Sequence, residues 1–434
     1  MRNTATFAIT DYNKFKQQVL YWSNSFSTCC FLDNNFYQDK FNSHECIVAV
    51  DIASKFTCNK NILQQFKLYC NSRHDWLFGH INYDVKNEIE NLSSQNPDYI
   101  QFPEIFFFVP LTVIQIKQQS ATISSIGENP VEIFKKINSF QDNHEKCFSN
   151  FSIKPRISKT EYLKIIKLLQ KHILRGDCYE INFCQEFFAE NAVLDPLAIY
   201  YKLNAFSPVP FSAFYKLDNK YLLCASPERF LKKTANKIIS QPIKGTYKRN
   251  IENALIDEQY KEQLQLSTKD KSENVMVVDL VRNDLSKICE EGTVKVDELF
   301  GIYSFPQVHQ LISTVSCYLK DGIDIKDILS ATFPMGSMTG APKRIVMELI
   351  EKYEHTKRGI FSGTVGYISP EKNFDFNVVI RSILYNATNK YLSYLVGSGI
   401  TFYSNAEEEY EECILKAKAI NEVLNLMPKD IQVK

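Results

Sequence analysis

Glycine is scarce in this chain of 434 residues: there are 14, and 12 of them lie at or after Gly176. Because glycine marks backbone positions that need a positive φ or a close approach, the specialised backbone is expected late in the chain. Net charge is also absent, since 50 Lys and Arg balance 50 Asp and Glu. This balance excludes binding to nucleic acid or to an anionic membrane surface through overall charge.

Long apolar segments and paired cysteines are missing as well. The longest mainly apolar run, residues 105–116, is interrupted by Pro110 and is shorter than the roughly 20 residues of a membrane-spanning helix. The first residues have no apolar segment of the signal-peptide type. The 12 cysteines include no C-x-x-C pair. We therefore expect reduced, mostly buried cysteines in a soluble cytoplasmic protein.

The length allows two or three domains of about 150 residues, or one large α+β domain. We expect an N-terminal region over 1–150, packed into the same fold, and a catalytic region over 151–434, joined by the polar segment 141–150. Helices and strands alternate without the short βαβ period of a doubly wound sheet. The expected fold class is therefore α+β.

Local signals define the expected elements of the second region. Ser158 and Glu161 form a capping-box pattern that opens a helix, and Gly176 ends it. Asp195 and Pro196 open another helix. The sequence further predicts strands over 178–188, 361–369, 374–385 and 391–403, and helices over 267–289, from 339–342 to 353, and over 406–426.

The last predicted helix carries the clearest polar pattern. Glu409, Glu412 and Lys416 are spaced i, i+3 and i+7, so they share one face, which borders an apolar stripe. A solvated face with weak surface ion pairs is the alternative. The segment 397–400 before this helix, at the end of an apolar strand, is expected to be a turn, either one that offers backbone N–H groups to an anion or a plain tight turn.

Three other segments carry candidate groups. Lys244 lies in a predicted turn, where a surface lysine is the alternative. Glu273 lies on an apolar helix, and residues 282–284 after it could simply tie helix ends together. Residues 336–343 lack the spacing of a phosphate-binding loop, and Pro342 removes a needed N–H, which excludes such a loop.

Five of these blocks follow one another in a characteristic order. They are SPERF at 226–230, PIKGT at 242–246, SENVMVVDLVRNDL at 272–285, FPMGSMTGAPK at 333–343 and GSGITFYSNAEEEYEECILKA at 397–417. In this order they resemble the chorismate-utilising enzymes, which include anthranilate, aminodeoxychorismate, isochorismate and salicylate synthases. Residues 1–150 match more loosely, through FGHINYDVKNEIE at 78–90. The resemblance implies two stacked sheets flanked by helices.

The resemblance also implies sites for Mg²⁺ and for chorismate. Glu273 and Glu412 match the metal ligands, with Glu409 beside them directly or through water. Three carboxylates brought together from two distant helices would repel each other unless a cation lay between them. Arg381 resembles the arginine that binds the enolpyruvyl carboxylate through a bidentate contact. The other substrate-binding residues implied are Thr246, Gln310, Gly397, Gly399 and Lys416.

The chain departs from the family pattern at two positions. Gln310 stands where relatives commonly have a histidine, with His309 one residue earlier, and Phe361 replaces a tyrosine found in some relatives. Any role of that histidine would therefore fall to a neutral amide, and any substrate contact of the tyrosine hydroxyl would be absent.

Lys244 separates the subgroups of this family. Anthranilate, isochorismate and salicylate enzymes have alanine there, whereas lysine is typical of the aminodeoxychorismate synthases. The resemblance implies that Lys244 attacks C2 of chorismate, that Glu228 protonates the leaving 4-hydroxyl, and that ammonia then adds at C4 and expels the lysine. Because the attacking amine must be neutral, Arg381, Lys416 and Mg²⁺ are expected to lower the pKa of Lys244.

Alternatives remain at the level of function. Glu180 stands where isochorismate and salicylate enzymes have a water-activating lysine, which disfavours water addition, although a glutamate can itself act as a base. Within the family the alternative is anthranilate synthase component I. From another class, it is a non-catalytic partner that activates a glutaminase. No cysteine lies in a G-x-C-x-G elbow, so ammonia is expected from a separate glutamine amidotransferase subunit.

Overall fold

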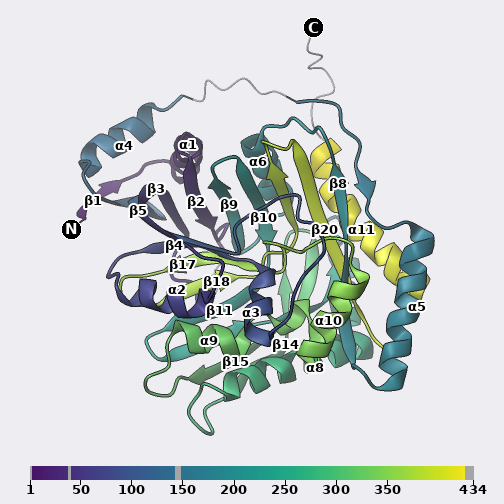
Figure 1. The fold of residues 1–434 in the computed structure, drawn as a ribbon. Helices are drawn as coiled ribbons and strands as arrows, with labels where there is room; N and C mark the ends of the chain where they lie inside the picture. The colour runs from purple at the N-terminus through teal and green to yellow at the C-terminus, as the bar shows by residue number, and fades with distance from the viewer. Residues whose placement is uncertain (1, 38–40, 142–147, 426–434) are drawn as a thin grey trace.

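The computed structural model describes residues 2–37, 41–141 and 148–425. Its strands form one hydrogen-bonded network in which the long strand β5 (Ile105–Lys117) belongs to two sheets. The first half of β5 pairs with β4 (Leu77–Ile81), the second half pairs with β6 (Ser120–Ser125), and β3 (Cys46–Thr57) runs along the other edge. Two sheets therefore diverge from β5, and helices flank them (Figure 1). This confirms the expected α+β class.

All pairings in both sheets are antiparallel. The first sheet continues from β3 through β2 (Thr28–Asp33), β9 (Phe211–Leu217), β10 (Lys220–Ser226), β19 (Ser382–Asn386), β20 (Tyr391–Ile400) and β8 (Glu180–Ala189). Short strands extend it: β1 (Asn3–Ala8) on β6, and β7 (Lys154–Pro155) and β16 (Gly340–Ala341) on β8. The second continues from β4 through β17 (Thr364–Ile368), β18 (Phe374–Asn377), β11 (Arg229–Thr234), β12 (Lys237–Gln241) and β15 (Val308–Tyr318), which also pairs with β13 (Ile243–Lys248) and β14 (Lys295–Ser304).

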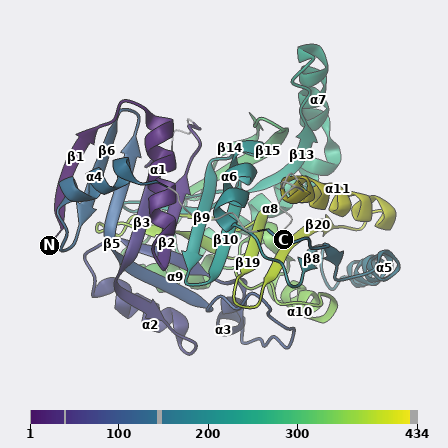
Figure 2. The same cartoon turned by 90° about the horizontal axis from the view of Figure 1, so that it is seen from above.

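The helices cover the outer faces of the sheets, and α7 projects from the body (Figure 2). They are α1 (Tyr12–Asn24), α2 (Ile62–Asn71), α3 (Lys86–Glu90), α4 (Pro130–Ser139), α5 (Lys159–Arg175), α6 (Pro196–Phe206), α7 (Ala254–Leu266), α8 (Thr268–Ser286), α9 (Ile325–Thr332), α10 (Lys343–Tyr353) and α11 (Ala406–Asn425), with 3₁₀ turns η1 (Tyr83–Val85) and η2 (Gly336–Met338). Within the described ranges, none of these helices combines the length and apolar character needed to cross a bilayer.

Strand alternation explains why the molecule has two apolar cores. Neighbouring residues on one strand point to opposite faces of the sheet. In β2, Cys29 packs beneath the helices and Cys30 packs between the sheets. In β9, Phe214 packs beneath the helices and Tyr215 packs between the sheets. All four side chains are fully buried. The first sheet is therefore covered on both faces, and the two sheets are stacked as expected.

Most predicted elements of residues 151–425 are confirmed. The Ser158 hydroxyl accepts the Glu161 N–H at the start of α5, and Gly176 ends that helix with a φ of 85°. The predicted strands over 178–188, 361–369 and 391–403 correspond to β8, β17 and β20, and the predicted helices correspond to α6, α8, α10 and α11. Residue 426, the predicted end of the last helix, lies outside the described residues.

The predicted strand over 374–385 is wrong in its middle. β18 ends at Asn377 and β19 begins at Ser382. Arg381 lies between them with a φ of 50°, in the left-handed region that a strand residue does not adopt. The continuous apolar sequence on both sides concealed this break.

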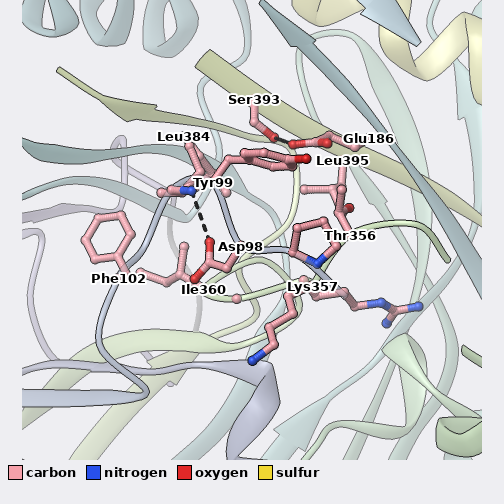
Figure 3. A pocket seen from close by; sticks show the side chains of 14 residues that line it. Asp98, Tyr99, Phe102, Glu186, Thr356, Lys357, Ile360, Leu384, Ser393 and Leu395 are labelled. Atoms are coloured by element: carbon pink, nitrogen blue, oxygen red, sulfur yellow. Dashed lines mark hydrogen bonds between the residues drawn. The ribbon is translucent and has the colours of Figure 1, made fainter. Parts of the chain in front are cut away.

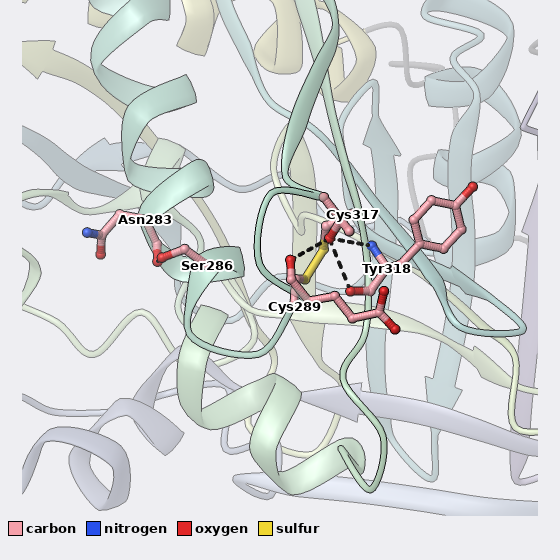
Figure 4. Close-up of a disulfide and its surroundings, with 7 residues drawn as sticks. Asn283, Ser286, Cys289, Cys317 and Tyr318 are labelled. Atoms are coloured by element: carbon pink, nitrogen blue, oxygen red, sulfur yellow. Dashed lines mark hydrogen bonds between the residues drawn. A yellow bond between two sulfur atoms is a disulfide. The ribbon is translucent and has the colours of Figure 1, made fainter.

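The expectation of reduced cysteines is wrong for one pair. Cys289, just beyond α8, is joined to Cys317 near the end of β15, with Cα atoms 6.1 Å apart (Figure 4). Their separation of 28 residues matches no local motif, so only the packing of α8 and β15 brings them together. The other cysteines of the described residues are free, and all but Cys58 are buried.

The boundary between the two expected regions stays a prediction. The proposed connection, 141–150, falls largely on residues 142–147, which lie outside the described residues. Strands from both sides of it pair directly, as β2 does with β9 and β4 does with β17.

Candidate active site

The candidate site lies at the end of the first sheet, where β8 faces β13 of the second sheet. Helix α8 packs on β13 and β15, and α11 packs on β20. These elements bring together side chains that are far apart in the sequence. Lys244 on β13 and Glu180 on β8, 64 residues apart, are in direct contact.

Lys244 and Glu180 form a buried ion pair. The Lys244 Nζ donates to Glu180 Oε1 at 2.6 Å, and their side chains are only 11% and 3% exposed. Gly399 lies directly against the pair: a Cβ on this residue would be 2.8 Å from Glu180 Oε1 and 2.9 Å from Lys244 Nζ. The absence of a side chain at Gly399 therefore makes room for the two charged groups.

The segment 397–400 is part of a strand, so the expectation of a turn is wrong. It lies within β20 in register with β8, where Gly397 is opposite Cys184 and Gly399 is opposite Asn182. A Cβ on Gly397 would be 2.3 Å from the Cys184 Sγ. Both glycines thus serve close packing of strands and side chains.

The neighbours of Lys244 are mainly carboxylates. Burial by itself lowers the pKa of Lys244, but Glu180, Glu273 and Glu228 together raise it above its ordinary value. Among these residues, the carboxylates therefore outweigh the lowering of the Lys244 pKa that was expected from Arg381 and Lys416. Lys244 is held as an ammonium, which has no lone pair for attack.

Glu228 follows β10 and is almost fully buried. Burial raises the pKa of Glu228 to about 7, against the smaller opposing effects of the Ser337 hydrogen bond and of Lys244. The Ser337 Oγ donates to Glu228 Oε1 at 2.6 Å. A carboxyl group that titrates near neutral pH can donate a proton to a reacting group.

Arg381 is held near Glu228 by the break between β18 and β19. The Val378 N–H, three residues before Arg381, donates to the Glu228 carbonyl oxygen at 3.0 Å. Burial lowers the pKa of Arg381 to about 10, although Glu228 opposes this. Across the residues that the structure describes, no group accepts a hydrogen bond from the Arg381 guanidinium. Its N–H donors are therefore available for an anion.

The three proposed metal ligands lie on α8 and α11. Burial raises the pKa of Glu273 to about 7, although the positive charge of Lys244 acts to lower it. Burial also acts to raise the pKa of Glu412, but Lys416 outweighs this effect, so the pKa of Glu412 is lowered. Glu412 Oε1 lies 2.7 Å from the Lys416 Nζ, which also donates to the Gly397 carbonyl at 2.9 Å. Lys416 therefore links α11 to β20.

Lys269 supplies a cation among these carboxylates. Its Nζ lies 3.6 Å from the buried Glu409. Burial lowers the pKa of Lys269, but Glu409, Glu273 and Glu412 together raise it. In the described ranges, no three His, Cys, Asp or Glu side chains converge closely enough to hold a metal by themselves. The all-oxygen donor set nevertheless fits Mg²⁺, which binds few carboxylates together with water and substrate oxygens.

Gln310 reaches the site from β15. It is paired with Thr246 of β13, and its Nε2 donates to the Thr246 Oγ1 at 3.3 Å. The Gln310 Oε1 is buried and has no hydrogen-bond partner among the described residues. His309 does not replace the missing histidine, because its ring nitrogens contact Ser304 and Asp257. Phe361 is buried in the core between the sheets.

Sequence reasoning missed Lys269 and Ser337. Lys269 lies four residues before Glu273, so the two share a face of α8, and this spacing was a usable signal. Ser337 lies in the quoted block 333–343, but only the fold brings its hydroxyl to Glu228. In the same block, Lys343 pairs with Asp284 at 2.5 Å, so Asp284 does tie helix ends together.

A cavity of about 10 Å³, room for about one water molecule, lies elsewhere, among Asp98, Tyr99, Glu186 and Lys357 (Figure 3). None of the residues discussed above as site residues lines it.

Residues 27–422 match the model of the chorismate binding enzyme family. The chain belongs to this family. One relative, aminodeoxychorismate synthase component 1 of Escherichia coli (strain K12), is 33% identical over 355 residues, which cover 81% of this chain and 76% of the relative. Anthranilate synthase component 1 of Saccharolobus solfataricus is 34% identical, with 81% of this chain and 80% of the relative covered. Overall identity thus does not separate the two subgroups.

Other matches define the fold and the extent of the similarity. A probable chloroplastic aminodeoxychorismate synthase of rice is 39% identical over 62% of this chain, but the match spans only 30% of the rice protein. The crystal structure of anthranilate synthase component I from Streptococcus pneumoniae TIGR4 superposes with a TM-score of 0.76 at 23% identity, covering 88% of this chain and 93% of that chain. This family member therefore has the fold of a chorismate-binding enzyme.

Proposed function

We propose that the chain is component I of an aminodeoxychorismate synthase, which converts chorismate and ammonia to 4-amino-4-deoxychorismate in p-aminobenzoate and folate synthesis. The observation that carries the proposal is Lys244, a buried lysine beside Glu228 at the position where anthranilate synthases have alanine. Relatives named aminodeoxychorismate synthase component 1 support it.

The proposed reaction uses the residues in separate roles. Lys244 attacks C2 of chorismate, and Glu228 protonates the departing 4-hydroxyl. Arg381 and Lys416 provide positive charge for the substrate carboxylates, and Thr246, Gln310, Gly397 and Gly399 are the other residues proposed to bind the substrate. When bound by Glu273, Glu409 and Glu412, Mg²⁺ would neutralise the ring carboxylate of the substrate.

The partners are chorismate and a glutamine amidotransferase subunit that supplies ammonia. The name component 1, carried by the bacterial relatives, fits a separate second component. The cytoplasmic location expected from the sequence stays a prediction.

The product formed from chorismate, Mg²⁺ and ammonium tests the proposed function. We expect 4-amino-4-deoxychorismate without release of pyruvate, detected by liquid chromatography with mass spectrometry. Fluorescent anthranilate with pyruvate would overturn the proposal in favour of the alternative within the family. No turnover of chorismate would instead support the non-catalytic partner.

Changing Glu412 to Gln is expected to weaken Mg²⁺ binding by about tenfold or more, because an amide replaces one anionic oxygen ligand. Isothermal titration of Mg²⁺ measures this independently of turnover. Glu408→Gln is the matched control, since Glu408 is an exposed glutamate on the same helix. Equal Mg²⁺ affinity in the Glu412 and Glu408 variants would contradict the assignment.

A further inference from the structure

We propose that Glu180 takes a proton from Lys244 as the lysine attacks chorismate and returns it when the lysine leaves. This inference rests on the proposed function and adds a catalytic residue to it. It assigns to Glu180 a role different from the activation of water, because the proton acceptor here serves the lysine nucleophile.

The contact geometry supports a direct transfer. Glu180 Oε1 and Lys244 Nζ are 2.6 Å apart, the distance of a strong charge-assisted hydrogen bond. Both groups are enclosed, and Gly399 leaves the space that they fill. No intermediate group or water is needed to carry the proton between the two atoms.

The second oxygen of the same carboxylate separates this pair from an ordinary structural ion pair. Glu180 Oε2 is buried and has no hydrogen-bond partner in the described residues. Buried polar atoms in structural pairs are normally satisfied, since an unpaired buried oxygen loses its hydrogen bonds to water without replacement. An unpaired, buried oxygen beside the nucleophile is available to hold a proton while the lysine is bound to substrate.

The other carboxylates around the Lys244–Glu180 pair have different roles. Glu228 must already carry a proton to act as the acid, so it is not free to take one from Lys244. Glu273 of α8 and Glu412 of α11 also act on Lys244 electrostatically, but within the described ranges only Glu180 is hydrogen-bonded to its Nζ.

In the part of the chain that the structure describes, none of the other elements packed on β8 (β7, β16, β20 and α10) places a side chain in a hydrogen bond or ion pair with Lys244 or Glu180. On α10, Lys343 pairs with Asp284, and Arg344 pairs with Glu348. β16 consists of Gly340 and Ala341. β20 presents Gly399 to the pair.

The proposed steps balance in atoms and charge. The proton moves from Lys244 Nζ to Glu180, and the freed lone pair forms the Nζ–C2 bond. The two ring double bonds shift toward C4, the C4–O bond breaks, and the leaving hydroxyl takes the Glu228 proton and departs as water. Ammonia then bonds to C4, the double bonds shift back, and the C2–Nζ bond breaks with its electron pair returning to Nζ. Glu180 returns its proton to Lys244, and Glu228 is reprotonated from solvent.

Glu180→Gln tests this role, because the amide keeps the size of the side chain but accepts no proton at neutral pH. We expect the turnover of chorismate with ammonium at pH 7 to fall about 10²-fold relative to the unchanged protein. This difference should narrow as the pH rises, because hydroxide then removes the lysine proton in the variant, whereas the decline caused by deprotonation of Glu228 is common to both proteins. Glu186→Gln is the control: Glu186 is a buried glutamate on the same strand that pairs with Arg156. Its pH profile is expected to match that of the unchanged protein.

Each outcome distinguishes a proton-transfer role of Glu180 from a purely structural role. A Glu180→Gln variant with unchanged turnover, or with the same loss at every pH, overturns the proton role and leaves the proposed function standing. If the unchanged protein makes anthranilate, both proposals fail. Should Glu180→Gln not fold, Glu180→Asp replaces it. The shorter carboxylate is expected to slow turnover but keep the original pH profile, and an altered profile would overturn the role.

Discussion

Replacing Lys244 with alanine is expected to reduce ammonia-dependent turnover of chorismate by about 10³-fold or more, because it removes the only group proposed to form a bond to C2. Steady-state assays with saturating ammonium measure the loss. Lys248→Ala is the matched control: Lys248 is an exposed lysine on the same strand, and its Nζ lies over the Tyr260 ring. The control is expected to keep full turnover.

Folding must be separated from chemistry in this experiment. Lys244→Ala leaves Glu180 buried without its partner, which typically costs about 3–5 kcal/mol of stability. Lys244→Arg keeps a positive charge beside Glu180 but offers no neutral nitrogen at neutral pH. We therefore expect Lys244→Arg to retain more of the free energy of unfolding, measured in urea, and to be as inactive as Lys244→Ala. Substantial turnover in either variant would contradict the nucleophile role.

Glu228→Gln is expected to lower turnover by about 10²–10⁴-fold, because an amide does not protonate the leaving hydroxyl. In the unchanged protein, Glu228 has a pKa of about 7 and works in its protonated form. Turnover should therefore fall as the pH rises above about 7, and this decline should be missing in Glu228→Gln. Turnover measured from pH 5.5 to 9 checks both points.

Ser337→Ala provides a control for the assignment of that decline. The Ser337 hydroxyl stabilises the charged form of Glu228 and so lowers its pKa. Its removal should move the decline to higher pH while leaving the acid in place. If the decline persists in Glu228→Gln, or does not move in Ser337→Ala, another group controls it.

The sequence predicted local features of the fold better than contacts across it. The boundaries of α5 follow from Ser158 and Gly176, whose effects act within a few residues. The break at Arg381 was missed because valine and isoleucine flank it as in a strand. The segment 397–400 was expected to be a turn, since glycine usually marks turns, but here the glycines make room for Cys184, Lys244 and Glu180.

The candidate site was only partly accessible from the sequence. Motif resemblance supplied Lys244 and Glu228 as single residues. Their protonation depends on neighbours from other elements, and these raise the pKa of Lys244 where the opposite shift was expected. The ion pair with Glu180 spans 64 residues and the disulfide spans 28, so both arise only once the chain has folded.

The most direct test of the proposed chemistry is to look for a covalent bond at Lys244. The unchanged protein is incubated with chorismate and Mg²⁺ without ammonium, and its mass is measured intact and after proteolysis. We expect an adduct of chorismate less one water on the peptide that contains Lys244, and its disappearance when ammonium is added. Turnover of chorismate with ammonium, but with no adduct or with an adduct on another residue, would contradict Lys244 as the nucleophile.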